Sequence, residues 1–158
     1  MYLPDLSLIR SSPSLPNGVQ RLAVGWLEQG QPHSTGEPST KVLARLTLFK
    51  EVNLYFGFHV CDFCGNAAGN GEIHVWGRDP CLFVAPVMIH HYMSEHRYQP
   101  PEVFLRAVLE GPSPESKSYE QFNYWYAEGG WEDVDFGLEA SPPNYEFPIA
   151  DTADLYGS

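Results

Sequence analysis

The sequence predicts an α+β fold, and three observations lead to this class. Two alternating apolar segments, "GEIHVWG" and "CLFVA", flank the turn residues "RDP" and predict a β-hairpin. Two segments that begin with proline, "PVMIHHYMSEH" and "PPEVFLRAVLEG", have the spacing of short helices. A Cys-x-x-Cys pair precedes the hairpin and a histidine cluster follows it. One metal ion could therefore join a cysteine turn, the hairpin and a helix.

Before the hairpin we expect a strand, a helix and a second short strand. The segment "VQRLAVGWLEQG" (residues 19–30) has a β-rich apolar centre and ends in glycine, which predicts a strand followed by a loop. In "STKVLARLTLFKEV" the apolar residues recur near the helical period, and Ser39 or Thr40 is suited to cap the first turn. The segment "LYFGFHV" predicts a short aromatic strand that leads into the cysteines.

The alternation of the hairpin assigns its side chains to two faces. Ile73 and Val75 are expected on one face, and Glu72, His74 and Trp76 on the other.

Both helices after the hairpin are expected to begin with proline, whose missing N–H would be unpaired in the first turn in any case. Pro86 would lie in the first turn of one helix, and Gly111 would end the other. One side of the second helix is expected to be apolar, with the residues Val103, Phe104, Ala107 and Val108.

Composition divides the chain at residue 111. The 158 residues suit a single core, and the net charge is −11. Residues 1–110 carry eight basic and ten acidic side chains, whereas residues 111–158 carry one basic and ten acidic. We therefore predict an α+β domain over residues 1–111 and an acidic, aromatic C-terminal extension over residues 112–158. The extension shows no clear period, and we expect it to pack on the domain or on a partner.

Several classes of function are disfavoured by composition. No apolar run approaches the roughly 20 residues that cross a bilayer, and the N-terminus lacks the regions of a signal peptide, so we expect a cytoplasmic protein without membrane contact. The acidic surface repels phosphates, and residues 86–106 hold only two basic side chains, which argues against nucleic acid as a partner. Signatures of nucleotide-binding loops, serine hydrolases and zinc proteases are absent from the sequence.

The strongest chemical signal is the cysteine and histidine constellation. Cys61 and Cys64 can reach one ion from a tight turn, and His91 and His96 follow with H-x4-H spacing. Mixed thiolate and imidazole ligands favour zinc over iron or copper. The fourth ligand is either His96 or His59, which would point to the same side of a strand as Cys61. His96 lies about 140° around an ideal helix from His91, so the helix would have to end or distort there.

Other readings of these residues carry less weight. A thioredoxin-like CxxC opens a helix after a strand, whereas here a Gly and Asn-rich loop follows. Four available ligands favour a closed, structural zinc site; an open site with Glu95 as general base would instead suit a hydrolase. We expect His33, His74 and Glu72 to be solvated, and Cys81 to be a small buried hydrophobe.

The chain also resembles a family of small uncharacterised bacterial proteins of the actinobacterial type, described only as a domain of unknown function. The resemblance covers about residues 1–110 and is carried by "YLPDL", "LAVGWLEQGQPHSTG", "GFHVCDFC", "GNGEIHVWG" and "APVMIHHYMSEHRYQPPEVFLRAV". Its motifs are H-x-C-x-x-C and HY-x3-H-x-Y-x-PP. The resemblance implies a metal-binding role for the matching residues, which here are His59, Cys61, Cys64, His91 and His96. The chain departs from the family at Cys81, where a tyrosine is expected, and in its acidic extension. No activity follows from the resemblance.

Taken together, these observations predict a non-enzymatic, zinc-stabilised protein-interaction module. Its acidic, aromatic extension would bind a basic protein partner, because aromatic residues supply contact area and carboxylates steer association. An immunity protein or a small defence-related regulator fits this description. The alternative is the zinc-dependent hydrolase with an open metal site.

Overall fold

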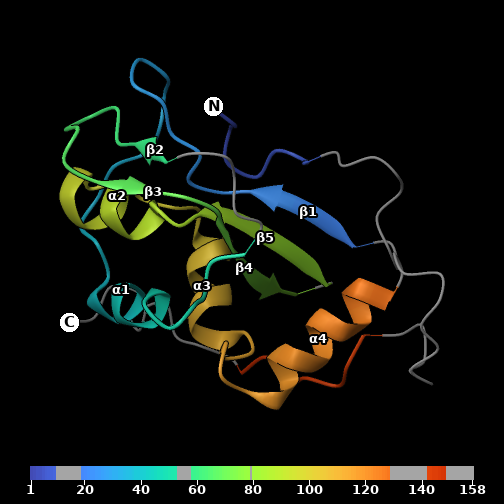
Figure 1. The fold of residues 1–158 in the computed structure, drawn as a ribbon. Coiled ribbons are helices and arrows are strands. Elements are labelled where there is room, and N and C mark those ends of the chain that lie inside the picture. The colour runs from blue at the N-terminus through green and yellow to red at the C-terminus, as the bar shows by residue number, and fades with distance from the viewer. Residues whose placement is uncertain (10–18, 53–57, 79, 129–141, 149–158) are drawn as a thin grey trace.

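The structure, a computed structural model, describes residues 1–9, 19–52, 58–78, 80–128 and 142–148. The helices and strands of these residues confirm the predicted α+β class (Figure 1). In chain order they are β1 (Gln20–Ala23), α1 (Thr40–Leu46), β2 (His59–Val60), β3 (Ala68–Gly69), β4 (Glu72–Gly77), β5 (Cys81–Pro86), α2 (Ile89–His96), α3 (Glu102–Glu110) and α4 (Lys117–Glu128).

In the described part of the chain, three strands form the main sheet, in the order β1-β5-β4. Strands β4 and β5 are antiparallel, with Ile73 opposite Ala85, so the predicted hairpin is confirmed. Strand β1 pairs parallel to β5, with Leu22 opposite Phe83. The chain between β1 and β4 holds α1 and a small antiparallel ribbon of β2 and β3, which carries the cysteine turn.

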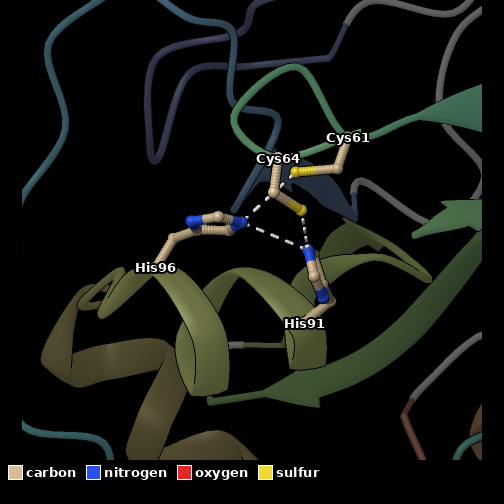
Figure 2. Close-up of side chains that lie close together, drawn as sticks. All are labelled: Cys61, Cys64, His91 and His96. Atoms are coloured by element: carbon tan, nitrogen blue, oxygen red, sulfur yellow. Dashed lines mark hydrogen bonds between the residues drawn. The ribbon is translucent and has the colours of Figure 1, made fainter. Parts of the chain in front are cut away.

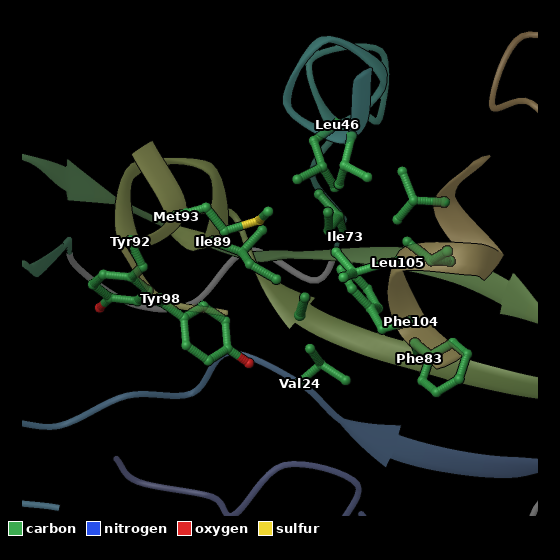
Figure 3. Close-up of a cluster of buried hydrophobic side chains, with 14 of the residues drawn as sticks. Val24, Leu46, Ile73, Phe83, Ile89, Tyr92, Met93, Tyr98, Phe104 and Leu105 are labelled. Atoms are coloured by element: carbon green, nitrogen blue, oxygen red, sulfur yellow. The ribbon is translucent and has the colours of Figure 1, made fainter. Parts of the chain in front are cut away.

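The two faces of the sheet bury different sets of side chains, as the alternation predicted. On one face, Ile73 and Val75 pack with helices α1, α2 and α3 in the main core, part of which Figure 3 shows. On the other face, Trp76 packs against Phe122 and Trp125 of α4. The sheet is thus covered by helices on both sides, and α2 places its C-terminal end beside the β2–β3 ribbon (Figure 1).

Helix α1 begins as its sequence predicted, because the hydroxyl of Ser39 accepts a hydrogen bond from the amide of Val42 at 3.3 Å. Helix α3 ends at Gly111, also as predicted. One member of its predicted apolar face is wrong, since Val103 is 53% exposed and Leu105 is buried in its place. Val103 and Leu105 lie about 100° to either side of Phe104, so helical spacing alone does not decide which of the two is buried.

The predicted start of the helix after the hairpin is also wrong. Pro86 is the last residue of β5, where it lies opposite Glu72, and α2 begins only at Ile89. A proline is tolerated at the end of a strand because the ladder needs no further N–H from it. The pairing with β4 therefore extends the strand through Pro86.

Helix α4 was missed because the C-terminal extension was taken as aperiodic. Its buried face consists of aromatic residues three or four positions apart, which is helical spacing: Tyr119, Phe122, Trp125 and Tyr126. Acidic and polar residues between them dilute the pattern. The division into a domain of residues 1–111 and an extension of residues 112–158 stays a prediction, although α4 contributes directly to the packing of the sheet.

Candidate metal centre

The two cysteines lie on a tight turn between β2 and β3. The amide of Cys61 donates to the carbonyl of Ala67 at 2.8 Å, and the amide of Gly65 donates to the carbonyl of Cys61 at 2.9 Å. Gly65 has a φ of 68°, a backbone conformation that glycine adopts without strain. The amide of Asn66 lies 3.4 Å from the Cys64 sulfur, so the turn supplies a donor to one thiolate. The sulfurs of Cys61 and Cys64 therefore lie on the same side of the turn, facing α2 (Figure 2).

Of the strand predicted before this turn, β2 contains only His59 and Val60, and residues 53–57 lie outside the described residues.

The two histidines come from the last two turns of α2. The helix ends at His96 because Arg97 adopts a left-handed conformation with a φ of 56°. The amides of Arg97 and Tyr98 both donate to the carbonyl of Tyr92, which tightens the end of the helix. His96 is thereby brought toward His91, and their Nε2 atoms lie 3.2 Å apart. The helix end that the sequence required for this pairing is present.

Four donor atoms converge between the turn and the helix (Figure 2). The Cys61 sulfur lies 3.4 Å from the Nε2 of His96, and the Cys64 sulfur lies 3.4 Å from the Nε2 of His91. All four atoms lie within 4.8 Å of one another, close enough to hold a metal ion.

These distances can be compared with a tetrahedral zinc site. With Zn–S bonds of about 2.3 Å and Zn–N bonds of about 2.05 Å, a tetrahedron has S to N edges of about 3.6 Å and an N to N edge of about 3.3 Å. The observed separations of 3.4 Å and 3.2 Å match these edges to about 0.2 Å. These three separations fit a tetrahedral ion.

Aromatic rings surround the cluster on the side of the turn. Phe63 packs on His96 with ring centroids 5.1 Å apart and on Tyr92 at 6.0 Å. His33, which we expected at the surface, is half-buried and packs edge-on against Phe63 at 5.5 Å. Cys61 is 2% exposed, whereas the other three donor residues are half-buried. The cluster therefore lies at the surface with its deepest ligand sealed from water.

The surroundings favour the protonation states that metal ligands need. Burial, together with the neighbouring His96, lowers the pKa of His91, so its imidazole is neutral at physiological pH. Burial and then the charges of Cys61, Asp62 and Cys64 raise the pKa of Tyr92 to about 12, so that phenol stays neutral beside the two cysteines. A neutral imidazole has the lone pair that coordination requires.

The structure brings together four of the five residues in the predicted ligand set and leaves out the fifth. His59 lies on β2 with an exposed side chain, and it is not part of the cluster. Strand β2 ends at Val60, before Cys61. The alternation that would have placed His59 and Cys61 on the same side of a strand therefore does not reach Cys61. Glu95, the general base of the hydrolase alternative, is exposed on α2.

A buried polar group on the sheet was missed by sequence reasoning. Glu72 and His74 were expected to be solvated, yet the side chain of Glu72 is only 4% exposed and that of His74 is 15% exposed. A carboxylate oxygen of Glu72 lies 3.2 Å from the Nε2 of His74 and 3.7 Å from a guanidinium nitrogen of Arg21. The alternation placed Glu72 and His74 on the same face as Trp76, which packs against α4, so this face of the sheet is not open to solvent along its whole length. Cys81 is half-buried and lies outside the cluster.

The fold and the site together define a small α+β protein with a possible metal-binding cluster of two cysteines and two histidines. The chain belongs to DUF7919, a family described as a domain of unknown function, whose model matches residues 1–109. All four clustered residues lie in the matched region. No curated protein and no solved structure shows significant similarity to the chain.

A membrane-spanning helix was not expected, and among the described residues no helix has the length and apolar character to cross a bilayer.

Proposed function

We propose that Cys61, Cys64, His91 and His96 bind one Zn²⁺ in a closed, structural site, and that the chain is a non-enzymatic protein-interaction module built around it. The observation that carries the proposal is that three of the donor separations match the edges of a tetrahedral N₂S₂ zinc site, with all four donors within 4.8 Å of one another. Two thiolates with two imidazoles favour zinc among the common divalent metals.

Four protein ligands support a structural rather than a catalytic role. A catalytic zinc keeps one position open for water or substrate, whereas here four side chains account for a tetrahedral shell. The ion would tie the β2–β3 turn to the C-terminal end of α2, two segments 27 to 35 residues apart along the chain. Because the four ligands come from two separate segments, metal binding and local folding would be coupled.

The proposed partner is a basic protein. This is the kind of partner that an acidic immunity or defence-related protein would bind. Support comes from the net charge of −11 and from the outer face of α4, which exposes Glu120 and 54% of Tyr124. Glu115 and Glu146, elsewhere in the acidic part of the sequence, are exposed as well. A large aromatic ring beside carboxylates provides contact area together with electrostatic steering.

Metal analysis and the variant Cys61→Ala test the zinc centre. We expect one zinc per chain in the purified protein, and we expect the variant to lose both the metal and the native near-UV circular dichroism spectrum. A variant that lost zinc but kept the native spectrum and stability would contradict a structural role and would favour the hydrolase alternative.

Charge reversal tests the partner. We expect Glu115→Lys, Glu120→Lys and Glu146→Lys together to abolish recovery of the native complex from the source cell. The matched control reverses three other exposed carboxylates, Glu37, Glu51 and Glu102, and should leave recovery unchanged. Equal recovery with both triple variants would remove the acidic surface from the proposal.

A further inference from the structure

The two cysteines of the metal centre differ in their access to solvent. Cys61 is 2% exposed, whereas Cys64 is half-buried, on a turn where Asp62, Gly65 and Asn66 are exposed. A small reagent in solution therefore reaches the sulfur of Cys64 more readily than that of Cys61. Cysteines that respond reversibly to oxidants have this arrangement, in which an accessible sulfur lies beside a second thiol that can react with it.

The two sulfurs are also close neighbours. They belong to the four donor atoms that lie within 4.8 Å of one another, and Figure 2 shows both on the side of the turn that faces α2. A disulfide has an S–S length of about 2.05 Å, so the two sulfurs would have to approach by less than about 3 Å to form one. The turn has room for this change, because a side-chain carbon at Gly65 would meet no atom within 4 Å beyond its own chain neighbours.

The third cysteine of the chain lies elsewhere in the fold. Cys81 is the first residue of β5, whereas α2 follows the last residue of that strand, Pro86. It is not among the four clustered donors. Cys61 and Cys64 are therefore the two cysteines that the fold brings together.

A metal at this site would hold a weak element of structure. Strands β2 and β3 have two residues each, and a two-stranded ribbon alone is at best marginally stable in water. The ribbon includes the hydrogen bond from the amide of Cys61 to the carbonyl of Ala67, directly at a metal ligand. By contrast, β4 and β5 pair over six residues each. Loss of the metal would therefore loosen the cysteine turn and leave the main sheet in place.

We propose that the metal centre is a redox switch, in which hydrogen peroxide joins Cys64 to Cys61 and releases the zinc. This inference rests on the zinc site proposed above and adds its regulation. The Cys64 thiolate attacks one oxygen of the peroxide, which forms a sulfenic acid and expels hydroxide. The Cys61 thiolate then attacks the Cys64 sulfur, so that an S–S bond forms and a second hydroxide leaves.

The two sulfurs together give up two electrons, which reduce one hydrogen peroxide to two hydroxide ions. With both thiolates consumed, His91 and His96 remain as ligands. Two imidazoles are too few for a closed tetrahedral zinc site, so the ion leaves. A dithiol reductant would reverse the change by restoring both thiolates.

Treatment of the zinc-loaded full chain with hydrogen peroxide tests the switch. We expect zinc release, followed with a zinc-binding dye, to be at least tenfold faster than in untreated protein. Peptide mapping by mass spectrometry should find one Cys61–Cys64 disulfide for each zinc released. Of the three cysteines, Cys81 alone should then react with an alkylating reagent. A dithiol reductant with added zinc should restore metal binding.

Hydrogen exchange reports the structural consequence of oxidation. The amides of Cys61 and Gly65, which bond within the turn, should exchange at least tenfold faster in the oxidised protein. The amides of β4 and β5 should exchange as before, because the main sheet does not depend on the metal. Unchanged exchange in the turn after disulfide formation would overturn the switch.

Two variants distinguish the sulfurs of the centre from other effects of peroxide. Cys64→His supplies an imidazole in place of the accessible thiolate, and zinc bound to it should be released by peroxide at least tenfold more slowly than from the wild type. Cys81→Ser is the matched control, since it removes a half-buried thiol outside the cluster, and it should release zinc at the wild-type rate. Should Cys64→His fail to hold zinc, disulfide mapping in the wild type decides the matter.

The failure of the switch can be told apart from the failure of the zinc site. Zinc that stays bound under peroxide, or zinc release with a disulfide that includes Cys81, would overturn the switch and leave the structural zinc site intact. Equal release from the wild type and zinc-loaded Cys64→His would do the same. Purified protein without zinc would contradict the proposed function itself, and the switch with it.

Discussion

His91 and His96 lie five residues apart on α2, yet their Nε2 atoms are separated by only 3.2 Å. On a continuous helix the two side chains would point about 140° apart. They meet because the helix ends at His96 and Arg97 turns the chain in a left-handed conformation. This helix end creates the donor pair that faces the two cysteines.

Removing the metal is expected to lower the melting temperature. Zinc at about 1,000 times its dissociation constant contributes about 4 kcal/mol. Because 1 kcal/mol corresponds to about 2–4 °C in a protein of this size, we expect a chelator to lower Tm by about 8–16 °C. Scanning calorimetry with and without the chelator measures this shift. Cys81→Ser, which changes a thiol outside the cluster, should respond to the chelator as the wild type does. An unchanged Tm in the wild type would argue against a bound structural metal.

The fourth ligand can be assigned by comparing His96→Ala with His59→Ala. Loss of groups that only support ligands costs about 10–100-fold in metal affinity, so loss of a ligand itself should cost at least about 100-fold. We expect this loss for His96→Ala and no change for His59→Ala, whose side chain is exposed on β2. Competition with a zinc-binding dye measures both affinities. The reverse ranking would show that His59 coordinates the metal.

Tyr98 is expected to make stability fall at alkaline pH. Its hydroxyl donates to the Asp5 carboxylate at 2.8 Å, and burial followed by the charge of Asp5 raises its pKa above the usual value of 10.0. A raised pKa in the folded state gives stability that is fully present below pH 10 and lost as the pH rises above it. Urea unfolding at pH 7 and above pH 10 should show a steeper loss for the wild type than for Tyr98→Phe.

At neutral pH, Tyr98→Phe should lower the free energy of unfolding by about 1.5–3 kcal/mol, the contribution of a hydrogen bond to a charged group. The control is Tyr124→Phe, which changes a tyrosine that is 54% exposed and should have little effect at either pH. Identical pH profiles for wild type and Tyr98→Phe would contradict the role of Tyr98.

Packing of α4 on the sheet predicts different costs for two neighbouring aromatic residues. Trp125 is 3% exposed and packs on Trp76, whereas Tyr124 is 54% exposed. Trp125→Ala should lower the free energy of unfolding by about 3–5 kcal/mol, since it leaves a cavity against the sheet. Tyr124→Ala should cost less than about 1 kcal/mol. Urea denaturation measures both, and a small effect of Trp125→Ala would mean that α4 is dispensable for the fold.

Elements that depend on local pattern could be predicted from the residues alone. Alternation in "GEIHVWG" and "CLFVA" gave the hairpin and its two faces, and Ser39 and Gly111 marked helix ends, because capping and strand alternation act over a few residues. The same local spacing grouped Cys61 with Cys64 and pointed to the histidines of α2.

How distant segments meet could be seen only in the folded chain. Whether His59 or His96 joins the cluster depends on where β2 stops and on the turn at Arg97, which involve contacts 35 residues apart. The surroundings of Glu72 likewise involve a distant segment, because the Arg21 side chain on β1 lies 3.7 Å from its carboxylate and no local pattern around Glu72 encodes that contact. Local pattern sets which side of an element a residue occupies, but the packing of other elements sets what covers that side.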